Sequence, residues 1–444
     1  MSMSKFDLIV IGGGVGGAGV AIKASSYGQK VAIIEQRDWG GTTVNRGSTP
    51  KKVLLAAAEA HRHFETQVFS ETTPDINWEK LAAYRDNIVN QTAVKFKTRF
   101  QSNGITTYEG HAEFLNNHEV TVNGQTLSAT NIVTASGAHP KELRFSGSQF
   151  VQHSGSFFRS EQLPSKIVIM GAGIIAFAMA SIANEAGAEV VMLQHDAVAL
   201  RGYDHEFVGL LIDDLKQRGV RFQFNNEVKE IKSVDNCLHV LTQQSSITTD
   251  VIYTALGREA NISGLHLEQA GVKYTKHGIS VNDYLQTSQS NIYAVGDCAV
   301  TGVPQLANYA IYQGKYLGDS LSKTLAFPIK YQLPVTAVFS MPRLAQAGVT
   351  VQQANEQSDK YQVKSMSLAH WLNYQRNHDE QARLKLIINR QSQQVVGAEA
   401  YSYSADDLIN YLAILIQQNI SVKRLHDLFL AYPSTATDLY GIWV

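Results

Sequence analysis

The fold of this chain is decided near its start, by the run Phe6-Asp7-Leu8-Ile9-Val10-Ile11 and the Gly12-Gly13-Gly14-Val15-Gly16-Gly17 that follows it at once. The short apolar run with its β-branched residues predicts a buried strand, and the alanine-rich segment after the glycines predicts a helix. A second apolar run, Lys30 to Ile34, predicts another strand and leads into Glu35. The order strand, Gly-x-Gly-x-x-Gly, helix, strand and acid is typical of a fold that binds a dinucleotide.

Each position of this pattern has a physical role. Gly12 permits the tight turn, Gly14 lets the backbone approach a pyrophosphate, and Gly17 lets helix and strand pack closely. The helix N-terminus presents unpaired N–H groups and a positive dipole end to the phosphates, and Glu35 stands where an acid accepts a ribose hydroxyl. The alternative is a glycine-rich turn in an ordinary α/β domain, which the accompanying strands, helix and acid disfavour.

Composition limits the class of protein. The 444 residues suggest about three domains, and 44% hydrophobic with 17% charged residues is typical of a globular chain. A net charge of -1 gives no electrostatic footprint for nucleic acid or an anionic membrane, and no apolar stretch is long enough for a membrane helix. The N-terminal segment lacks the basic region and cleavage site of a signal peptide, so the expected location is cytoplasmic.

A second glycine pattern begins after the apolar run Ile167 to Met170. It reads Gly171-Ala172-Gly173-Ile174-Ile175-Ala176, with the small Ala176 in place of the third glycine, and a helical segment follows. Two dinucleotide folds in one chain indicate two nucleotide cofactors, held so that a hydride passes between them.

The next strand, Glu189 to Leu193, bears on the choice of the second nucleotide. It ends in Gln194 and His195, and Arg201 follows a few residues later. An acid at this place would bind the adenosine ribose and repel a 2′-phosphate. Gln194 is neutral, and His195 and Arg201 can contact a phosphate, so these residues favour NADPH over NADH.

The turn after the first fold is Gly40-Gly41-Thr42-Thr43-Val44-Asn45-Arg46-Gly47-Ser48-Thr49-Pro50-Lys51-Lys52. It resembles the class I pyridine nucleotide–disulfide oxidoreductases, such as glutathione reductase, dihydrolipoamide dehydrogenase and mercuric reductase, where the segment reads G-G-T-C-x-N-x-G-C-x-P-S-K. Thr43 and Ser48 stand at the positions of the two redox cysteines. A hydroxyl cannot cycle between dithiol and disulfide, because the thiolate is the attacking species in that chemistry.

The cysteines elsewhere do not replace that pair. The chain has only two, Cys237 and Cys298, far apart in sequence and without a C-x-x-C motif. This usage predicts neither a structural disulfide nor a metal site, and both residues are expected to be buried thiols.

The resemblance covers nearly the whole chain and implies FAD in the first fold and NAD(P) in the second. Matching segments include Ala135-Ser136-Gly137, Gly257-Arg258, and the run from Asn291 to Asp297, whose aspartate the family presents to the flavin. The implied FAD contacts are Gly12, Gly14, Gly17, Glu35, Gly41, Thr42, Lys52, Ala112, Gly137, Asp297, Leu306 and Ala307. The implied NAD(P) contacts are Gly171, Gly173, Ile175, Gln194, His195, Arg201, Gly257 and Arg258.

Two further family pairs are altered. Lys52 matches the lysine near the flavin, but Ala178 replaces its glutamate partner, and the adjacent Lys51 is expected to be a solvated first-turn charge. Near the C-terminus, Tyr432 replaces the acid/base histidine and Thr437 replaces the glutamate that orients it. A tyrosine with a pKa of about 10 is a poor base at neutral pH, although it can donate a hydrogen bond.

The predicted fold class is α/β, with two Rossmann-like dinucleotide-binding domains and a C-terminal α+β dimerisation domain. We expect residues 1–145 and 266–328 to form the FAD domain, 146–265 the NAD(P) domain and 329–444 the interface of a homodimer. Residues 65 to 105 are expected to form a helical excursion, with the helix itself running from Trp78 to Ser102.

The joint loss of both cysteines and of the acid/base pair, with both nucleotide sites kept, predicts an FAD-dependent NAD(P)H oxidoreductase without a dithiol relay. Electrons would leave for a non-disulfide acceptor such as a quinone, oxygen, a dye, a metal ion or a second nicotinamide. The acceptor would dock beside Thr43, Ser48 and Tyr432 of the partner subunit, which with Lys52 are the candidate catalytic residues. The alternatives are a soluble transhydrogenase and a sensing flavoprotein with negligible turnover.

Overall fold

The computed structural model describes residues 4–64, 72, 74–235, 237–323 and 327–443. These residues form two compact units. The first unit holds the described residues up to Val53, together with 82–142 and 257–330, and the second holds those of 54–81, 143–256 and 331 onward. The helices α3 (Ser48–Phe64) and α4 (Trp78–Ser102) contribute residues to both units.

A seven-stranded sheet forms the centre of the first unit, in the order β3-β2-β1-β6-β5-β4 with β19 beside β6. β1, β2, β3, β6 and β19 run parallel, and β4 and β5 continue the sheet as an antiparallel meander. Parallel strands are covered on both faces, which explains the uninterrupted apolar runs of β1 and β2. The bounds are β1 Ser4–Ile11, β2 Val31–Glu35, β3 Thr106–Glu109, β4 Ala112–Phe114, β5 Glu119–Val122, β6 Gln125–Thr134 and β19 Ile292–Ala294.

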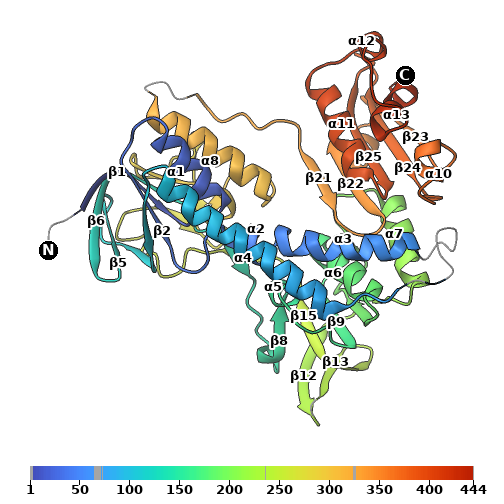
Figure 1. The fold of residues 1–444 in the computed structure, drawn as a ribbon, viewed down its shortest axis with the longest axis horizontal. Coiled ribbons are helices and arrows are strands. Elements are labelled where there is room, and N and C mark those ends of the chain that lie inside the picture. The colour runs from blue at the N-terminus through green and yellow to red at the C-terminus, as the bar shows by residue number, and fades with distance from the viewer. Residues whose placement is uncertain (1–3, 65–71, 73, 236, 324–326, 444) are drawn as a thin grey trace. The chain divides into compact units, whose positions relative to one another are not determined.

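Glycines let two helices of the first unit pack closely, α1 (Val15–Ser25) and α8 (Ala307–Ser322). They lie side by side in Figure 1. A Cβ on Gly314 would stand 2.2 Å from the carbonyl oxygen of Gly16, so no larger residue fits there. The remaining elements are α2 Gly41–Asn45, the 3₁₀ helix η2 Gly296–Cys298, β7 Ala138–Pro140, β16 Arg258–Ala260, β17 Tyr274–Thr275, β18 Gly278–Ser280 and β20 Ala299–Val300.

The second unit contains another parallel sheet, in the order β11-β10-β9-β15-β8. A separate antiparallel sheet, β12-β13-β14, follows in the chain between β11 and β15. The strands are β8 Val151–His153, β9 Lys166–Met170, β10 Glu189–Leu193, β11 Arg221–Gln223, β12 Val228–Val234, β13 Cys237–Thr242, β14 Ser246–Thr249 and β15 Val251–Thr254. The helices are η1 Ser148–Phe150, α5 Ser154–Phe157, α6 Ile174–Glu185 and α7 His205–Gln217.

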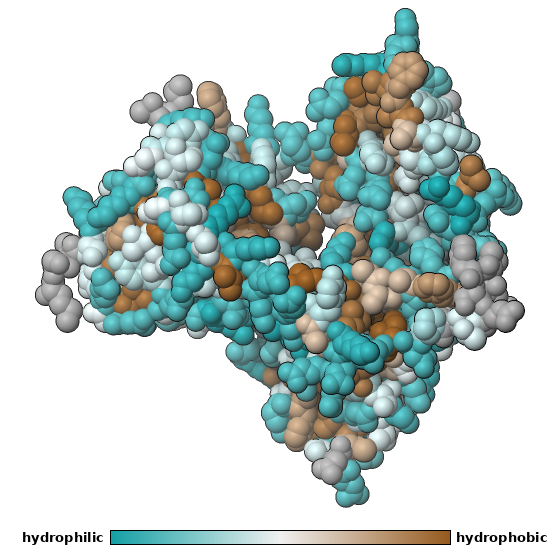
Figure 2. All heavy atoms as spheres, in the orientation of Figure 1, coloured by the Kyte–Doolittle hydropathy of each residue, from teal (hydrophilic) through white to brown (hydrophobic). Residues whose placement is uncertain are grey.

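The C-terminal part of the second unit is an antiparallel sheet, β21-β22-β25-β24-β23, packed against α11. Leu408, Ile409 and Leu412 form the buried face of α11. Figure 2 shows apolar side chains reaching the surface over this part of the chain, where Ile414 and Leu428 are exposed. The bounds are β21 Val335–Val338, β22 Arg343–Gly348, β23 Tyr361–Ser367, β24 Arg383–Asn389, β25 Val395–Ser402, α9 Val351–Glu356, α10 Leu372–Gln375, α11 Ala405–Gln417, α12 Val422–His426 and α13 Thr435–Ile442.

The predicted fold class is confirmed, with two parallel dinucleotide-type sheets and a C-terminal α+β layer. The predicted helix from Trp78 to Ser102 is α4. The earlier part of that predicted excursion, 65–71 and 73, lies outside the described residues. The division into four domain segments stays a prediction.

Candidate functional site

The first glycine-rich turn has a backbone that only glycine can supply. Gly12 has a φ of +116°, and a Cβ there would stand 2.3 Å from the carbonyl oxygen of Ala135. A Cβ on Gly17 would stand 2.0 Å from the carbonyl oxygen of Gly12. By contrast, a Cβ on Gly14 would meet only the Gly41 Cα at 3.9 Å, so the space where a side chain of residue 14 would stand is open. A tight turn that leads into a helix N-terminus fits a dinucleotide phosphate.

Glu35 folds back onto the same turn. Its Oε2 accepts a hydrogen bond from the Gly13 N–H at 2.8 Å, and its Oε1 accepts one from the Arg37 N–H at 2.8 Å. Burial raises the pKa of Glu35, and these two hydrogen bonds oppose that rise. A carboxylate has about four acceptor positions, so lone pairs remain for a ribose hydroxyl.

Several other residues predicted for FAD come together within the first unit. Arg258, predicted to contact NAD(P), donates to the Thr42 hydroxyl at 3.4 Å and to the Ala138 carbonyl. Burial lowers the pKa of Arg258 and raises that of Asp297, and each charge partly offsets the shift of the other. Charged groups that are desolvated in this way are common at ligand sites.

The remaining FAD candidates occupy element ends and turns. Ala112 begins β4 and is buried, and Gly137 follows β6 with a φ of +71°. Leu306 is the N-cap of α8 and Ala307 is its first residue, so the N-terminus of that helix begins at the predicted flavin segment.

One of the two adjacent lysines of α3 is placed opposite to expectation. Lys51, predicted to be a solvated charge, is only 8% exposed, whereas Lys52 is exposed. Burial lowers the pKa of Lys51 to about 8. α3 begins at Ser48, and its register turns position 51 inward, so the prediction for Lys51 was wrong.

The hydroxyl residues at the family's redox positions are accessible. Thr43 is half-buried in α2, and Ser48 is exposed at the first residue of α3. In the second unit, Tyr432 is 79% exposed. Thr437 has a structural role, because its hydroxyl accepts from the Ser434 N–H at 3.0 Å and completes the capping box of α13.

The second glycine-rich turn repeats the geometry of the first. Gly171 has a φ of +110°, and a Cβ there would stand 2.9 Å from the Ala255 carbonyl oxygen. Space beside Gly173 is open, and α6 begins at Ile174 with Ile175 in its first turn. Ala178, at the family glutamate's position, is fully buried in α6.

Gln194, His195 and Arg201, which were predicted to decide between NADPH and NADH, all interact with one carboxylate. This carboxylate belongs to Asp196, which the prediction did not include. Asp196 forms ion pairs with Arg201 and with His195, whose Nε2 lies 3.1 Å from the carboxylate. The Gln194 side-chain amide donates to the same carboxylate at 2.8 Å, as does the Val198 N–H at 2.9 Å. The signal was present in the sequence, since Asp196 directly follows the residues considered.

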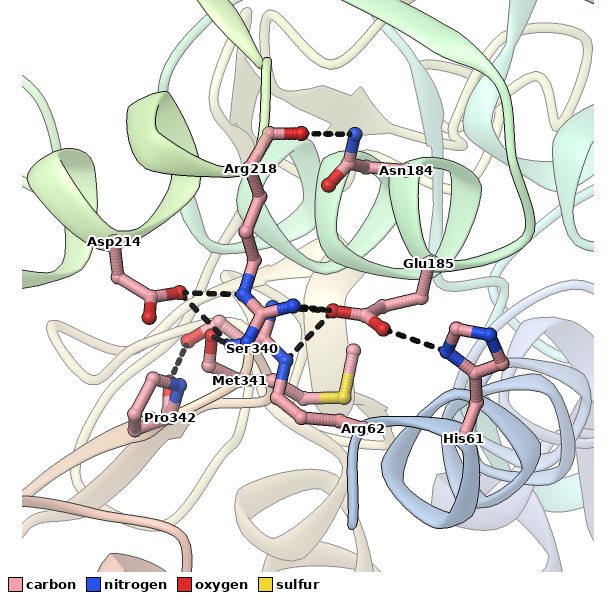
Figure 3. A network of polar contacts seen from close by, with 9 residues as sticks. All are labelled: His61, Arg62, Asn184, Glu185, Asp214, Arg218, Ser340, Met341 and Pro342. Carbon is pink, nitrogen blue, oxygen red and sulfur yellow. Dashed lines mark hydrogen bonds and ion pairs between the residues drawn. The ribbon is translucent and has the colours of Figure 1, made fainter. Parts of the chain in front are cut away.

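A buried ionic network lies elsewhere in the second unit, around Arg62 in the last turn of α3 (Figure 3). The Arg62 guanidinium donates to Glu185 at 2.6 Å, and to Asp214 and the Met341 carbonyl at 2.9 Å each. Glu185 also lies 3.2 Å from Arg218. Burial alone would lower the pKa of Arg62, but the two carboxylates raise it above its usual range. This network joins α3, α6, α7 and the β21–β22 turn, and no local sequence signal indicates it.

Comparison with known proteins decides the family. The sequence profile of the pyridine nucleotide-disulphide oxidoreductases matches residues 6–314, and that of their dimerisation domain matches residues 335–439. The chain belongs to this family. It is therefore an FAD-dependent oxidoreductase that uses NAD(P)H, and its dimerisation domain indicates a homodimer.

Relatives of this oxidoreductase match along nearly its whole length. A glutathione reductase of Burkholderia cepacia is 32% identical over 99% of this chain and 98% of its own. A mercuric reductase of Staphylococcus aureus is 29% identical over 98% of this chain and 81% of its own. Among solved structures, the HOCl-induced flavoprotein disulfide reductase RclA of Escherichia coli superposes with a TM-score of 0.90, with 25% identity and 98% coverage of both chains.

The thiols of this family member are both free. Cys298 is fully buried beside the carbonyl oxygens of Val295 and Thr134, at 3.3 and 3.5 Å, and burial raises its pKa. Cys237 is half-buried at the start of β13. Within the described residues, no three His, Cys, Asp or Glu side chains are grouped to hold a metal ion. No helix in the described part of the chain has the length and apolar character needed to span a bilayer.

Proposed function

We propose that this oxidoreductase passes electrons from NAD(P)H to a non-disulfide acceptor without a dithiol relay. The observation that carries the proposal is the chemistry at positions 43 and 48, where Thr43 and Ser48 offer hydroxyls in place of a thiol pair. The chain's own thiols do not supply a substitute, since both are free and Cys298 is buried with a raised pKa. A thiol whose pKa is raised is a poor nucleophile.

The site residues divide into three proposed groups. The turn around Gly12 and Gly14, with Glu35, would hold the FAD pyrophosphate and ribose, and Asp297 would face the flavin side. The turn around Gly171 and Gly173 would hold the nicotinamide nucleotide. When bound, FAD supplies the chemistry of accepting a hydride and passing two electrons on. The protein's part is to align the two nucleotides and to keep their phosphates at two helix N-termini.

The acceptor would dock beside Thr43 and Ser48, with Tyr432 from the partner subunit. Both hydroxyl residues are solvent-accessible, and Tyr432 is exposed on the dimerisation domain, as a residue that reaches a second subunit must be. Their hydroxyls can donate hydrogen bonds to an oxygen-bearing acceptor such as a quinone. Lys52, which is exposed to solvent, stays the proposed cation of this region.

The proposed organisation follows the family. Residues 1–145 and 266–328 would bind FAD, 146–265 would bind NAD(P), and 329–444 would form the dimer interface. The expected location of this enzyme is the cytoplasm, in keeping with the ordinary composition of the chain.

Steady-state assays with a panel of acceptors test the proposal. The purified holoenzyme should oxidise NADH or NADPH with ferricyanide or a quinone, and should show no activity above its flavin background with glutathione disulfide or lipoamide. The matched control is the thiol-free variant Cys237→Ser with Cys298→Ala, whose flavin content reports folding. It should keep the acceptor activity. Disulfide reduction that disappears in the thiol-free variant would contradict the proposal.

A further inference from the structure

The loop between β10 and α7 returns to the second glycine-rich turn. The Leu200 N–H donates to the Ala172 carbonyl at 2.9 Å, and Leu200 itself has a φ of +44°. This contact holds Arg201 and Asp196 beside the turn that would receive the nucleotide pyrophosphate. In a dinucleotide fold the adenosine ribose lies next to that turn, at the end of the second strand. The loop therefore borders the 2′-position of the nucleotide.

Asp196 is fixed and ionised in this loop. Its carboxylate accepts hydrogen bonds from the Val198 N–H and the Gln194 amide, and it pairs with Arg201 and His195. The Val198 and Gln194 hydrogen bonds, with the neighbouring cations, hold the pKa of Asp196 down at about 2. The carboxylate is consequently charged at every pH at which the enzyme works.

The charges around the loop balance. Asp196 offsets Arg201, and Glu227, which also interacts with His195, is paired with Lys229 at 2.6 Å. The guanidinium of Arg201 and the ammonium of Lys229 are thus each matched by a carboxylate, and neither is left as surplus charge for a doubly charged 2′-phosphate. The acceptor positions of Asp196 are taken by its four partners, so its carboxylate adds a fixed negative charge that repels such a phosphate.

We propose that Asp196 determines the nucleotide specificity of this enzyme, by holding Arg201 and His195 and by repelling a 2′-phosphate, so that NADH is the preferred donor. This inference rests on the proposed role of the second fold as the NAD(P) site. It opposes the preference for NADPH that Gln194, His195 and Arg201 alone predict, because that prediction omitted the carboxylate with which all three side chains interact.

Binding measurements on the FAD-loaded protein test this without relying on turnover. The probes are 2′,5′-ADP, which carries the 2′-phosphate, and 5′-ADP, which lacks it, titrated by calorimetry. Asp196→Asn should tighten binding of 2′,5′-ADP by about tenfold or more and change that of 5′-ADP by about twofold or less. In the double variant with Arg201→Met the gain should vanish, because the released guanidinium is its source.

The matched control is Asp213→Asn, which removes an exposed α7 carboxylate 3.5 Å from Lys216. It should leave both affinities unchanged. A wild-type protein that binds 2′,5′-ADP about tenfold more tightly than 5′-ADP would overturn the inference, as would an Asp196→Asn variant with an unchanged ratio of the two affinities. Failure of the wild type to bind either probe or to be reduced by either nicotinamide would instead contradict the proposed function.

Discussion

Lys51 is a charged side chain in a place where a charge is costly. Its 8% exposure desolvates the ammonium and lowers its pKa to about 8, so the neutral and charged forms are both accessible near physiological pH. Lys52, one position on, is exposed to solvent. A lysine with a lowered pKa is able to exchange a proton in the neutral range.

Lys51→Met should change the pH dependence of stability. The folded pKa lies below the unfolded value, so wild-type folding is penalised below about pH 8, and the penalty disappears as the pH rises above the unfolded pKa. The stability of the variant relative to wild type should therefore fall by about 2–3 kcal/mol between pH 7 and pH 10. Urea unfolding at both pH values measures this, with Lys52→Met as the control. An equal difference at the two pH values would contradict the burial of Lys51.

Single residues are also where prediction from sequence reached its limit. The P-K-K motif fixes a lysine near the start of α3, but consecutive helical positions differ by about 100°, so one residue of register decides which lysine is buried. Asp196 is a different kind of omission. Its proposed role in nucleotide specificity depends on its four interaction partners, which lie on both sides of it in the sequence. A prediction that follows only the family pattern does not consider position 196.

At the scale of elements, the α1–α8 contact supports the first nucleotide turn. Gly314→Ala should lower the free energy of unfolding by about 1–3 kcal/mol or more, because the new methyl meets the Gly16 carbonyl oxygen at 2.2 Å. The displaced α1 should also release FAD more readily. Gly209→Ala, in α7, is the control, since a methyl there would have nothing within 4 Å and should stabilise by about 0.5–1 kcal/mol. Equal effects at the two positions would show that α1 and α8 are not closely packed.

The ionic network at the end of α3 gives a second test at this scale. Arg62→Met should destabilise the protein by about 3–5 kcal/mol, because Glu185 and Asp214 lose their principal cation while they remain buried or half-buried. Adding Glu185→Gln should restore part of this loss. Arg221→Met, which removes an exposed arginine, should stay within about 0.5 kcal/mol of wild type. Chemical denaturation compares the four proteins, and a loss no larger than that of Arg221→Met would rule out the network as a stabilising contact.

Local pattern predicted the elements well. The helix Trp78–Ser102 and the strand Glu189–Leu193 agree with α4 and β10 to the residue. Both glycine-rich turns adopt the conformations that their spacing requires. Long-range contacts could not be predicted in this way. Arg62 and Glu185 are separated by 123 positions, and the sequence around either residue does not indicate that it pairs with the other.

For the whole molecule, the dimerisation domain supplies a prediction about assembly. Phe429 is fully exposed at 103%, and Leu428 and Tyr432 beside it are 46% and 79% exposed. Such a group of apolar and aromatic side chains is typical of an interface. Phe429→Asp should weaken the homodimer by about tenfold or more in sedimentation experiments. Val94→Asp, at an exposed position of α4, should leave the dimer intact. A Phe429→Asp protein that stays as dimeric as wild type would place the interface elsewhere.

The proposed enzyme has two nucleotide sites and no redox thiol pair at positions 43 and 48. Both glycine-rich turns keep the geometry that phosphates require, whereas Thr43 and Ser48 replace the redox pair and Tyr432 replaces the acid/base histidine. Loss confined to the disulfide chemistry, with both nucleotide turns retained, is the basis of the proposal that the acceptor differs from a disulfide.

Anaerobic titration of the purified protein with NADH and with NADPH, followed through the flavin absorbance, distinguishes a flavin-only enzyme from one with a thiol couple. We expect one equivalent of reduced nicotinamide to bleach the flavin fully, with NADH the tighter donor, and no long-wavelength thiolate–flavin charge-transfer band to develop. Uptake of a second pair of electrons together with such a band would mean that Cys237 or Cys298 takes part in the chemistry, and would contradict an electron path without a dithiol relay.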